Sequence, residues 1–289
     1  MHGLTRILLP FILLASCTPY EPATAPPQKK AAPARSAPAT ITPTPLTEAP
    51  KISENPSPLT ALSAPTLVTR NLPEFNLEGV AFDSRTHRLR VIDQAEGPGT
   101  IFTDAAQAGT SRNALAAINA GFFTPEGEPL GLVVAAGKSA GSWNSATSIG
   151  SAIWHESHSG ASRINRRNET NPATAKQMRE TLQSGPMLID RGLAVSGLES
   201  DKTSARCFIA WDGGTRWFIG RTSPCPLNSL AATLASGKHC GWTIHRAMNL
   251  DGGRSSDLWV SSRVSGGPLT SRPPWNRPVR NFFILVPRG

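Results

Sequence analysis

Short apolar runs separated by turn residues dominate the chain from about Leu67 onward. This pattern predicts strand pairs around three turns, at residues 84–87, 190–192 and 212–215. The third turn carries the strongest signal, because Gly213 and Gly214 readily adopt the positive φ that a tight hairpin requires. The predicted strand pairs are 79–83 with 89–93, 187–189 with 193–195, and 207–211 with 216–220.

Helical patterns are fewer than strand patterns. Asn171 and Pro172 predict the start of one helix, with Asn as N-cap and Pro at the first helical position, continuing through Lys176 to Leu182. Two more segments read as helices, 103–115 and 227–236, and three as additional strands, 116–120, 130–135 and 281–286. Because most consecutive strands are joined by hairpins, we expect an α+β fold, a single domain of largely antiparallel β-sheet with a few packed helices over residues 67–289.

The N-terminus has the pattern of an export signal. Arg6 precedes a short apolar run at residues 7–14, and small residues lead to Cys17. The run is too short to span a bilayer, which needs roughly 20 apolar residues. Residues 14–17 resemble the lipobox of bacterial lipoproteins, so we expect residues 1–17 to be a lipoprotein signal peptide with Cys17 as the lipidation site. An ordinary signal peptide with a chance cysteine is the alternative.

Thr18 stands where that signal would carry Asp for inner-membrane retention, which favours an outer membrane lipoprotein facing the periplasm. Residues 18–66 are rich in Pro, Ala, Thr and Ser and poor in branched apolar and aromatic residues. Such a composition cannot bury enough apolar surface to offset the entropy of ordering, so the segment is predicted to be a disordered tether.

A net charge of +9 invites comparison with nucleic-acid-binding proteins. The arginines are scattered, however, and no RNA- or DNA-binding motif is present, so we expect no nucleic-acid partner. A basic exported protein also fits an anionic glycan or a phosphodiester. The chain indicates membrane attachment through the lipid anchor and no obligate protein partner.

Three cysteines remain once Cys17 is assigned to the lipid. Cys225 lies in a loop and Cys240 follows the predicted helix at 227–236, so these two are predicted to form a disulfide in an oxidising compartment. Cys207 lies in an apolar run and is expected to be a buried free thiol.

Polar side chains interrupt the apolar pattern at three strand ends, each followed by glycine. Asn119 precedes Gly121, Ser184 precedes Gly185, and residues 249–253 read Asn-Leu-Asp-Gly-Gly. A buried carboxamide without partners costs about 1–3 kcal/mol, so each of these groups is either structurally satisfied or directed at a ligand. Three such junctions in one domain predict a single polar site.

These junctions also carry a family resemblance. The segments 119–123, 131–133, 182–188, 248–256 and 277–281, together with Arg206, resemble in this order the phosphodiester glycosidase family. The resemblance covers about residues 79–286. It implies hydrolysis of the bond between a sugar's anomeric carbon and a phosphodiester. Together with the export signal it indicates an envelope or extracellular glycan as substrate, and we expect no cofactor and no metal.

The resemblance and the local chemistry together give the candidate site residues. Asp251 is the predicted acid–base or electrostatic group and Glu78 the second carboxylate, with Glu126 and Glu128 as alternatives. Arg206 is predicted to bind the phosphate through a bidentate contact. The remaining predicted substrate-binding residues are Asn119, Gly121, Ser184, Gly185, Asn249, Gly252, Gly253 and Arg254.

Structural explanations stand beside these roles. An Asp before two glycines is by default a turn residue, an Asn at a strand end usually caps its own backbone, and Arg206 could pair with Asp201 or Asp212. Arg254 replaces a glycine common in the family; it adds strain if the position needs positive φ, or a cation if it faces the cleft. A noncatalytic glycan-binding or cell-wall-binding lipoprotein is therefore the rival function, and a structural envelope lipoprotein the third.

Other chemistry is disfavoured. His155 and His158 flank Glu156, but no third metal ligand is recognisable, so chance spacing explains them better than zinc. Ser184 lacks an obvious His partner and no nucleophile-elbow motif occurs, which disfavours a serine hydrolase.

Overall fold

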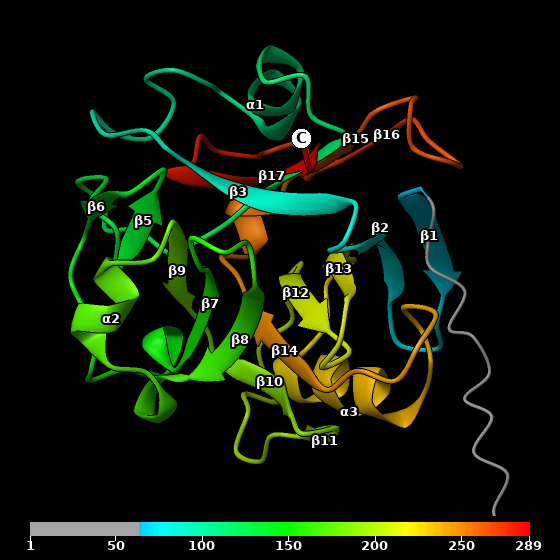
Figure 1. Ribbon diagram of the computed structural model, residues 1–289. Coiled ribbons are helices and arrows are strands. Elements are labelled where there is room, and N and C mark those ends of the chain that lie inside the picture. The colour runs from blue at the N-terminus through cyan, green and yellow to red at the C-terminus, as the bar shows by residue number, and fades with distance from the viewer. Residues whose placement is uncertain (1–63) are drawn as a thin grey trace, which may run out of the picture. The chain divides into compact units, whose positions relative to one another are not determined.

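The computed structural model describes residues 64–289, and these belong to one folded unit. The signal peptide, Cys17 and almost all of the tether fall outside the described residues. Three antiparallel sheets make up most of the unit, which confirms the predicted α+β class. Figure 1 shows them as three groups of arrows around a common centre, with one helix on the outside of each.

Sheet A is seven-stranded and has the order β1-β2-β13-β12-β14-β10-β11. Its strands are β1 (Thr66–Asn71), β2 (Asn76–Asp83), β10 (Met187–Asp190), β11 (Leu193–Ala194), β12 (Cys207–Trp211), β13 (Arg216–Thr222) and β14 (Arg246–Asn249). The predicted hairpins β10–β11 and β12–β13 are confirmed by their register, with Ile189 opposite Ala194 and Ile209 opposite Ile219.

Sheet B is five-stranded and has the order β16-β15-β4-β17-β3. Its strands are β3 (His87–Asp93), β4 (Ala116–Asn119), β15 (Leu258–Val260), β16 (Leu269–Ser271) and β17 (Asn281–Pro287). Sheet C is also five-stranded and has the order β6-β5-β9-β7-β8. It contains β5 (Val133–Ala135), β6 (Lys138–Ala140), β7 (Ala152–Glu156), β8 (Ser162–Arg166) and β9 (Glu180–Ser184).

The helices are short and lie outside the sheets (Figure 1). They are α1 (Ala105–Ser111), α2 (Pro172–Lys176) and α3 (Leu227–Ser236), with single 3-10 turns at Ser148–Gly150, Arg167–Glu169 and Gly253–Ser255. Asn171 caps α2 as predicted, because its side chain accepts from the backbone N–H of Ala173 at 2.8 Å. No helix within residues 64–289 is long and apolar enough to cross a membrane.

Two local predictions were wrong, and both errors have tertiary causes. The strands at 79–83 and 89–93 exist but do not form a hairpin, because β2 pairs with β13 in sheet A whereas β3 pairs with β17 in sheet B. The helix beginning at Pro172 ends at Lys176 rather than reaching Leu182, which lies in β9. There β9 has partners on both sides, β5 and β7, so sheet hydrogen bonds replace helical ones.

The main apolar core fills the space between the three sheets. This one cluster of buried side chains includes Ile209 of sheet A, Phe283 of sheet B and Trp154 of sheet C. Trp154 and Phe283 meet edge-to-face with ring centroids 4.8 Å apart. A second cluster lies between the other face of sheet A and α3, and it contains Phe208, Phe218 and Leu230.

The prediction of a disulfide between Cys225 and Cys240 is wrong, because Cys207, Cys225 and Cys240 are all free thiols in the described part of the chain. Cys225 and Cys240 are both buried in the cluster beneath α3, and Cys225 Sγ lies 3.4 Å from Thr222 Oγ1. Burial raises the pKa of both thiols, which keeps them protonated. Apolar packing therefore accounts for the pair, as it does for Cys207, whose pKa burial raises to about 12.

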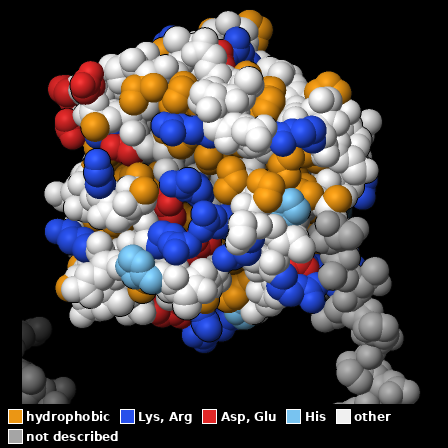
Figure 2. All heavy atoms as spheres, turned by 45° about the horizontal axis from the view of Figure 1, so that its top comes forward, with side chains coloured by type: hydrophobic (Ala, Val, Ile, Leu, Met, Phe, Trp, Pro, Cys, Tyr) orange, Lys and Arg blue, Asp and Glu red, His pale blue; other side chains and the backbone are white. Residues whose placement is uncertain are grey.

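Basic side chains gather in the middle of one face, with acidic side chains partly hidden among them (Figure 2). Ion pairs explain part of the basic character. Glu156 has no exposed side-chain surface and lies within 3.7 Å of Arg88, 3.6 Å of Arg179 and 3.3 Å of Arg288. These arginines therefore compensate a buried carboxylate.

Candidate functional site

The three polar junctions predicted from sequence meet where the sheets join. Asn119 ends β4, Ser184 ends β9 and Asn249 ends β14. Ser184 Oγ donates to the Asn249 carbonyl at 3.1 Å, and the Asp251 backbone N–H donates to the Ala120 carbonyl at 2.9 Å. Strands from all three sheets are thus joined by hydrogen bonds between motifs that are far apart in the sequence.

Asn119 lies entirely inside this junction. Its side-chain nitrogen donates to the Asp251 carbonyl at 2.7 Å, and its side-chain oxygen accepts from the Asp257 backbone N–H at 3.0 Å. The side chain has no exposed surface. Both ends of the carboxamide therefore hold backbone in place, which supports the structural explanation for this residue rather than the predicted ligand contact.

Glycines let the backbone segments of the junction approach closely. A Cβ on Gly252 would lie 2.6 Å from the Ala205 carbonyl oxygen, and Gly253 has a φ of +60° that favours glycine. Gly121 donates its N–H to Asn281 Oδ1 at 2.6 Å. Ser184 is completely buried, and Gly185 offers its carbonyl to Asn249 Nδ2 at 3.1 Å.

Asp251 follows Asn249 on the turn that leaves β14. One carboxylate oxygen accepts from the Gly252 N–H at 2.9 Å, whereas Oδ2 has no hydrogen-bond partner and lies 3.6 Å from Arg277 Nη2. Burial raises the pKa of Asp251, against the opposing influence of the Ser255 hydroxyl and the Arg277 guanidinium. A buried carboxyl held toward its neutral form is suited to proton donation.

Arg277 connects this carboxyl to the surface. Its Nε donates to Ser255 Oγ at 2.9 Å, and its guanidinium carbon lies 4.7 Å from the centre of the Phe123 ring. The side chain is 44% exposed, so it can reach a ligand while remaining next to Asp251. Arg277 belonged to a motif singled out in the sequence, but no role was predicted for it.

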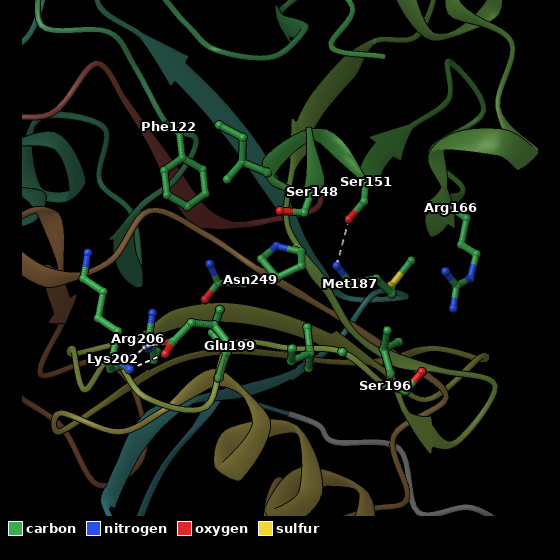
Figure 3. A pocket seen from close by; sticks show the side chains of 16 residues that line it. Phe122, Ser148, Ser151, Arg166, Met187, Ser196, Glu199, Lys202, Arg206 and Asn249 are labelled. Atoms are coloured by element: carbon green, nitrogen blue, oxygen red, sulfur yellow. Dashed lines mark hydrogen bonds and ion pairs between the residues drawn. The ribbon is translucent and has the colours of Figure 1, made fainter. Parts of the chain in front are cut away.

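A cleft of about 570 Å³ opens beside the junction. Figure 3 shows Asn249 near its centre, Phe122 at one side, Ser148, Ser151 and Arg166 at another, and Glu199, Lys202 and Arg206 along a third. Asn249 Oδ1 is buried without a hydrogen-bond partner, although its Nδ2 is held by the Gly185 and Leu250 carbonyls. The size and the mixed apolar and polar lining suit a small ligand.

Three cations line this cleft against one carboxylate. Arg166, Lys202 and Arg206 contribute positive charge, and Glu199 is the acidic residue among the lining side chains. Arg166 is paired with Asp190 at 2.7 Å, and Asp190 does not line the cleft. The balance favours an anionic ligand.

Arg206 is 8% exposed and well anchored. Its Nε donates to the Cys225 carbonyl at 2.8 Å, and its Nη2 donates to the Lys202 carbonyl at 2.5 Å and to Glu199 Oε2 at 3.2 Å. The alternative that Arg206 pairs with Asp201 or Asp212 is wrong, because its acidic partner is Glu199. Arg206 therefore both holds the loop and presents a cation to the cleft.

Glu78 does not join Asp251. It lies opposite Arg221 in the register of β2 and β13, and β13 and β12 separate β2 from β14. Three strand spacings make roughly 14 Å, too far for two carboxyl groups that act on one bond. The alternatives Glu126 and Glu128 are exposed and do not line the cleft.

Arg254 lies in the 3-10 turn at Gly253–Ser255 and is exposed. It is absent from the residues with positive φ, since that conformation falls on Gly253. Replacing a family glycine by Arg254 therefore causes no backbone strain. Its Nε donates to the Trp275 carbonyl at 3.3 Å, away from the cleft.

Sequence reasoning missed most of the cleft wall. Glu199 and Lys202 lie in a loop between β11 and β12 with no strand or helix signal of its own. Ser148 and Ser151 flank a single 3-10 turn. Only the basic character of the chain hinted at these positions.

The histidines singled out with Glu156 do not form a metal site. His155 Nε2 lies 3.4 Å from Asn165 Nδ2, and His158 Nε2 contacts the Gln177 carbonyl at 2.9 Å. Among residues 64–289, no group of three or more His, Cys, Asp or Glu side chains is placed to hold a metal ion.

Comparisons with known proteins fit this geometry. A family model described as phosphodiester glycosidase matches residues 112–286, more than half of the 289-residue chain. The match includes every junction motif. A comparison with curated protein sequences gives no match.

Solved structures share the fold. The catalytic domain of zebrafish N-acetylglucosamine-1-phosphodiester alpha-N-acetylglucosaminidase, auto-inhibited by its pro-peptide, has a TM-score of 0.54 at 15% identity, covering 78% of this chain and 83% of that one. A hypothetical protein from Synechocystis has a TM-score of 0.53 at 17% identity, covering 78% of this chain and 62% of that one. This chain thus matches less than two thirds of the Synechocystis protein.

A Burkholderia pseudomallei protein described as exported has a TM-score of 0.54 at 12% identity, with 74% of each chain covered. At these identities the three likenesses show a shared fold.

Proposed function

This chain belongs to the phosphodiester glycosidase family, and we propose that it hydrolyses a glycosyl phosphodiester. Water adds to the anomeric carbon, the bond from that carbon to the phosphate oxygen breaks, and the phosphate leaves as a phosphomonoester. The departing oxygen takes a proton from the protein, and the proton that the water loses replaces it. The observation that carries the proposal is the cleft beside the family motifs, where Arg166 is paired with Asp190 and Arg206 with Glu199, and Lys202 adds a third cation that has no ion-pair partner among residues 64–289. The zebrafish enzyme of similar fold is named for its N-acetylglucosamine-1-phosphodiester substrate, which supports the same class of substrate here.

The cations have a specific use in this reaction. A departing phosphomonoester has a second pKa near 6, so it is a much better leaving group than an alcohol. Positive charge from Lys202 and Arg206 would stabilise the negative charge that grows on the phosphate as the bond breaks. The Asn249 carboxamide, whose oxygen has no hydrogen-bond partner, would orient a sugar hydroxyl.

Asp251 is the proposed proton donor. Its unpartnered Oδ2 and raised pKa keep a proton available for the departing phosphate oxygen, and Arg277 lies 3.6 Å away to contact the phosphate. Because Glu78 is remote, the predicted Glu78–Asp251 pair does not serve as the two-carboxylate arrangement of common glycosidases.

The rival is a noncatalytic glycan-binding protein. Two observations favour it: Glu199, the carboxylate that lines the cleft, is bound to Arg206, and Asp251 is only 6% exposed. Arg254 no longer supports this rival, since it is unstrained.

Sugar release from a purified short N-acetylglucosamine-1-phosphodiester tests the proposal. We expect turnover by the wild type and a fall of about 10³-fold in Asp251→Asn, the size typical of a lost acid–base group. Arg206→Ala should also lose activity, and Arg70→Gln, an exposed arginine on β1, is the matched control. Equal background release by wild type, Asp251→Asn and Arg206→Ala would reject the enzyme and leave the binding protein.

We also propose that the protein is an outer membrane lipoprotein facing the periplasm and acting on an envelope or extracellular glycan. The lipobox-like residues 14–17 support this, and so does the exported Burkholderia pseudomallei relative. Labelled palmitate should be incorporated by the wild type and not by Cys17→Ser. Palmitate incorporation by neither protein would reject lipidation.

A further inference from the structure

A second hollow, of about 500 Å³, lies on the other side of the chain segment that walls the cleft. Within that segment Lys202 and Arg206 line the cleft, whereas Thr203, Ser204 and Ala205 line the hollow. The Gly253 N–H donates to the Ala205 carbonyl at 2.8 Å, which fixes the turn after Asp251 to the same segment. The segment 202–206 therefore separates the cleft from the hollow, and Asp251 lies on the turn that is hydrogen-bonded to this segment.

The hollow is strongly basic. Arg221, Arg254 and Arg272 line it, and no carboxylate is among its lining residues. Arg272 reaches one acidic partner outside the hollow, Asp104, at 3.0 Å. Arg221 donates from Nη1 to Ser271 Oγ at 2.8 Å, and its buried Nε has no hydrogen-bond partner. Three guanidinium groups with one paired carboxylate leave an excess of positive charge for an anion.

Trp275 forms an apolar edge of the same hollow. It follows Pro273 and Pro274, which restrict the loop, and it is 66% exposed. An exposed indole beside guanidinium groups offers an apolar face for a sugar ring next to donors for an attached phosphate.

Arg254 contributes its charge to the hollow from a position whose backbone does not require glycine. The side chain projects toward the Trp275 carbonyl, at 3.3 Å, and so adds a cation to the hollow rather than to the cleft. Because the backbone is compatible with either residue, Arg254→Gly removes the cation without imposing strain.

We propose that this hollow binds the neighbouring repeat of a phosphodiester-linked glycan, with a phosphate among Arg221, Arg254 and Arg272 and a sugar ring against Trp275. The proposal rests on the proposed function and narrows it. The substrate is then a chain of sugars joined through repeated phosphates, of which the cleft takes one repeat and the hollow the next. A single sugar phosphodiester would fill the cleft alone.

Calorimetric binding to the whole protein tests this with two probes: a short N-acetylglucosamine-1-phosphodiester and a tetramer of phosphodiester-linked N-acetylglucosamine. We expect the wild type to bind the tetramer at least tenfold more tightly than the short probe, with the advantage shrinking as salt rises. Arg254→Gly and Trp275→Ala should each remove most of that tenfold advantage. Arg70→Gln, an exposed arginine on β1, should keep it.

Inorganic tripolyphosphate separates phosphate recognition from glycan recognition. We expect it to bind weakly and to be insensitive to Trp275→Ala. If it binds as tightly as the tetramer, the hollow is a plain anion site and the glycan proposal fails. The proposal also fails if the wild type binds both sugar probes equally, or neither, or if both variants retain the tetramer advantage. Hydrolysis of the short probe is a separate measurement, so the proposed function can stand when the hollow does not bind.

Discussion

The junction where the three sheets meet and the wall of the cleft beside it use polar residues in opposite ways. In the junction, Asn119 and Ser184 have no exposed surface and spend their side chains on backbone groups. In the cleft wall, Lys202 lies on an exposed loop and lines open space, whereas Glu199 on the same loop is bound to Arg206. The most recognisable motifs of the sequence thus build the support, whereas less patterned residues offer charge to the ligand.

Asp251 and Asn249 lie between these two regions. Each has one side-chain oxygen buried without a hydrogen-bond partner while the rest of the group is held by backbone. A buried unsatisfied oxygen costs stability, so its retention at Asn249, which lines the cleft, and at Asp251 two residues later is consistent with use in binding or catalysis. The comparison teaches that motif membership alone does not identify a ligand contact, and that an unpartnered polar atom beside a cavity is the better candidate for one.

The largest effect that would test this contrast is on folding. Asn119→Ala leaves the Asp251 carbonyl and the Asp257 N–H without their partners, so we expect a loss of about 3 kcal/mol in the free energy of unfolding. Urea denaturation measures it, with exposed Asn76→Ala as the control. A variant as stable as the wild type but with weakened substrate binding would instead restore the ligand-contact role predicted from sequence.

A second test uses the buried carboxyl of Asp257, which accepts from the Ala105 N–H at the start of α1 at 2.8 Å. Burial raises its pKa from 3.8 to about 6. The neutral form is favoured in the fold, so its stabilising contribution is complete below pH 4 and is lost as pH rises through about 6. The wild type should therefore lose on the order of 2 kcal/mol of stability between pH 4 and pH 7 that Asp257→Asn does not lose.

Urea unfolding of both proteins at pH 4, 5.5 and 7 measures the difference. The carboxamide of Asp257→Asn keeps an acceptor for Ala105, so the comparison isolates the ionisation. Parallel stability curves for the two proteins would show that Asp257 does not titrate in this range.

The smallest effect is expected on the cleft side. Lys202→Met removes a lining cation from a loop without entering the junction, so KM for a short glycosyl phosphodiester should rise about fivefold while the melting temperature stays unchanged. Lys138→Met on β6, outside the cleft, is the matched control. A drop in melting temperature, or an unchanged KM, would remove the distinction between cleft wall and support.

Local patterns were sufficient for much of the secondary structure. The glycines of the turn after Trp211 and the Asn171–Pro172 helix start express preferences of single residues, and both predictions are confirmed. Burial of motif side chains was also foreseeable, because a polar residue inside an apolar strand needs partners. The family motifs likewise pointed to one shared site, and the structure brings them together at one junction.

Other features depended on contacts between distant segments. The sequence by itself determined about half of the strands, two of the three hairpins and the burial of the polar junction residues. Only the tertiary structure decided that β2 and β3 enter different sheets, that β9 replaces the end of a helix, and that Glu78 lies apart from Asp251. The physical reason is that turn and capping preferences act over a few residues, whereas sheet pairing and cleft walls depend on partners far away in the chain.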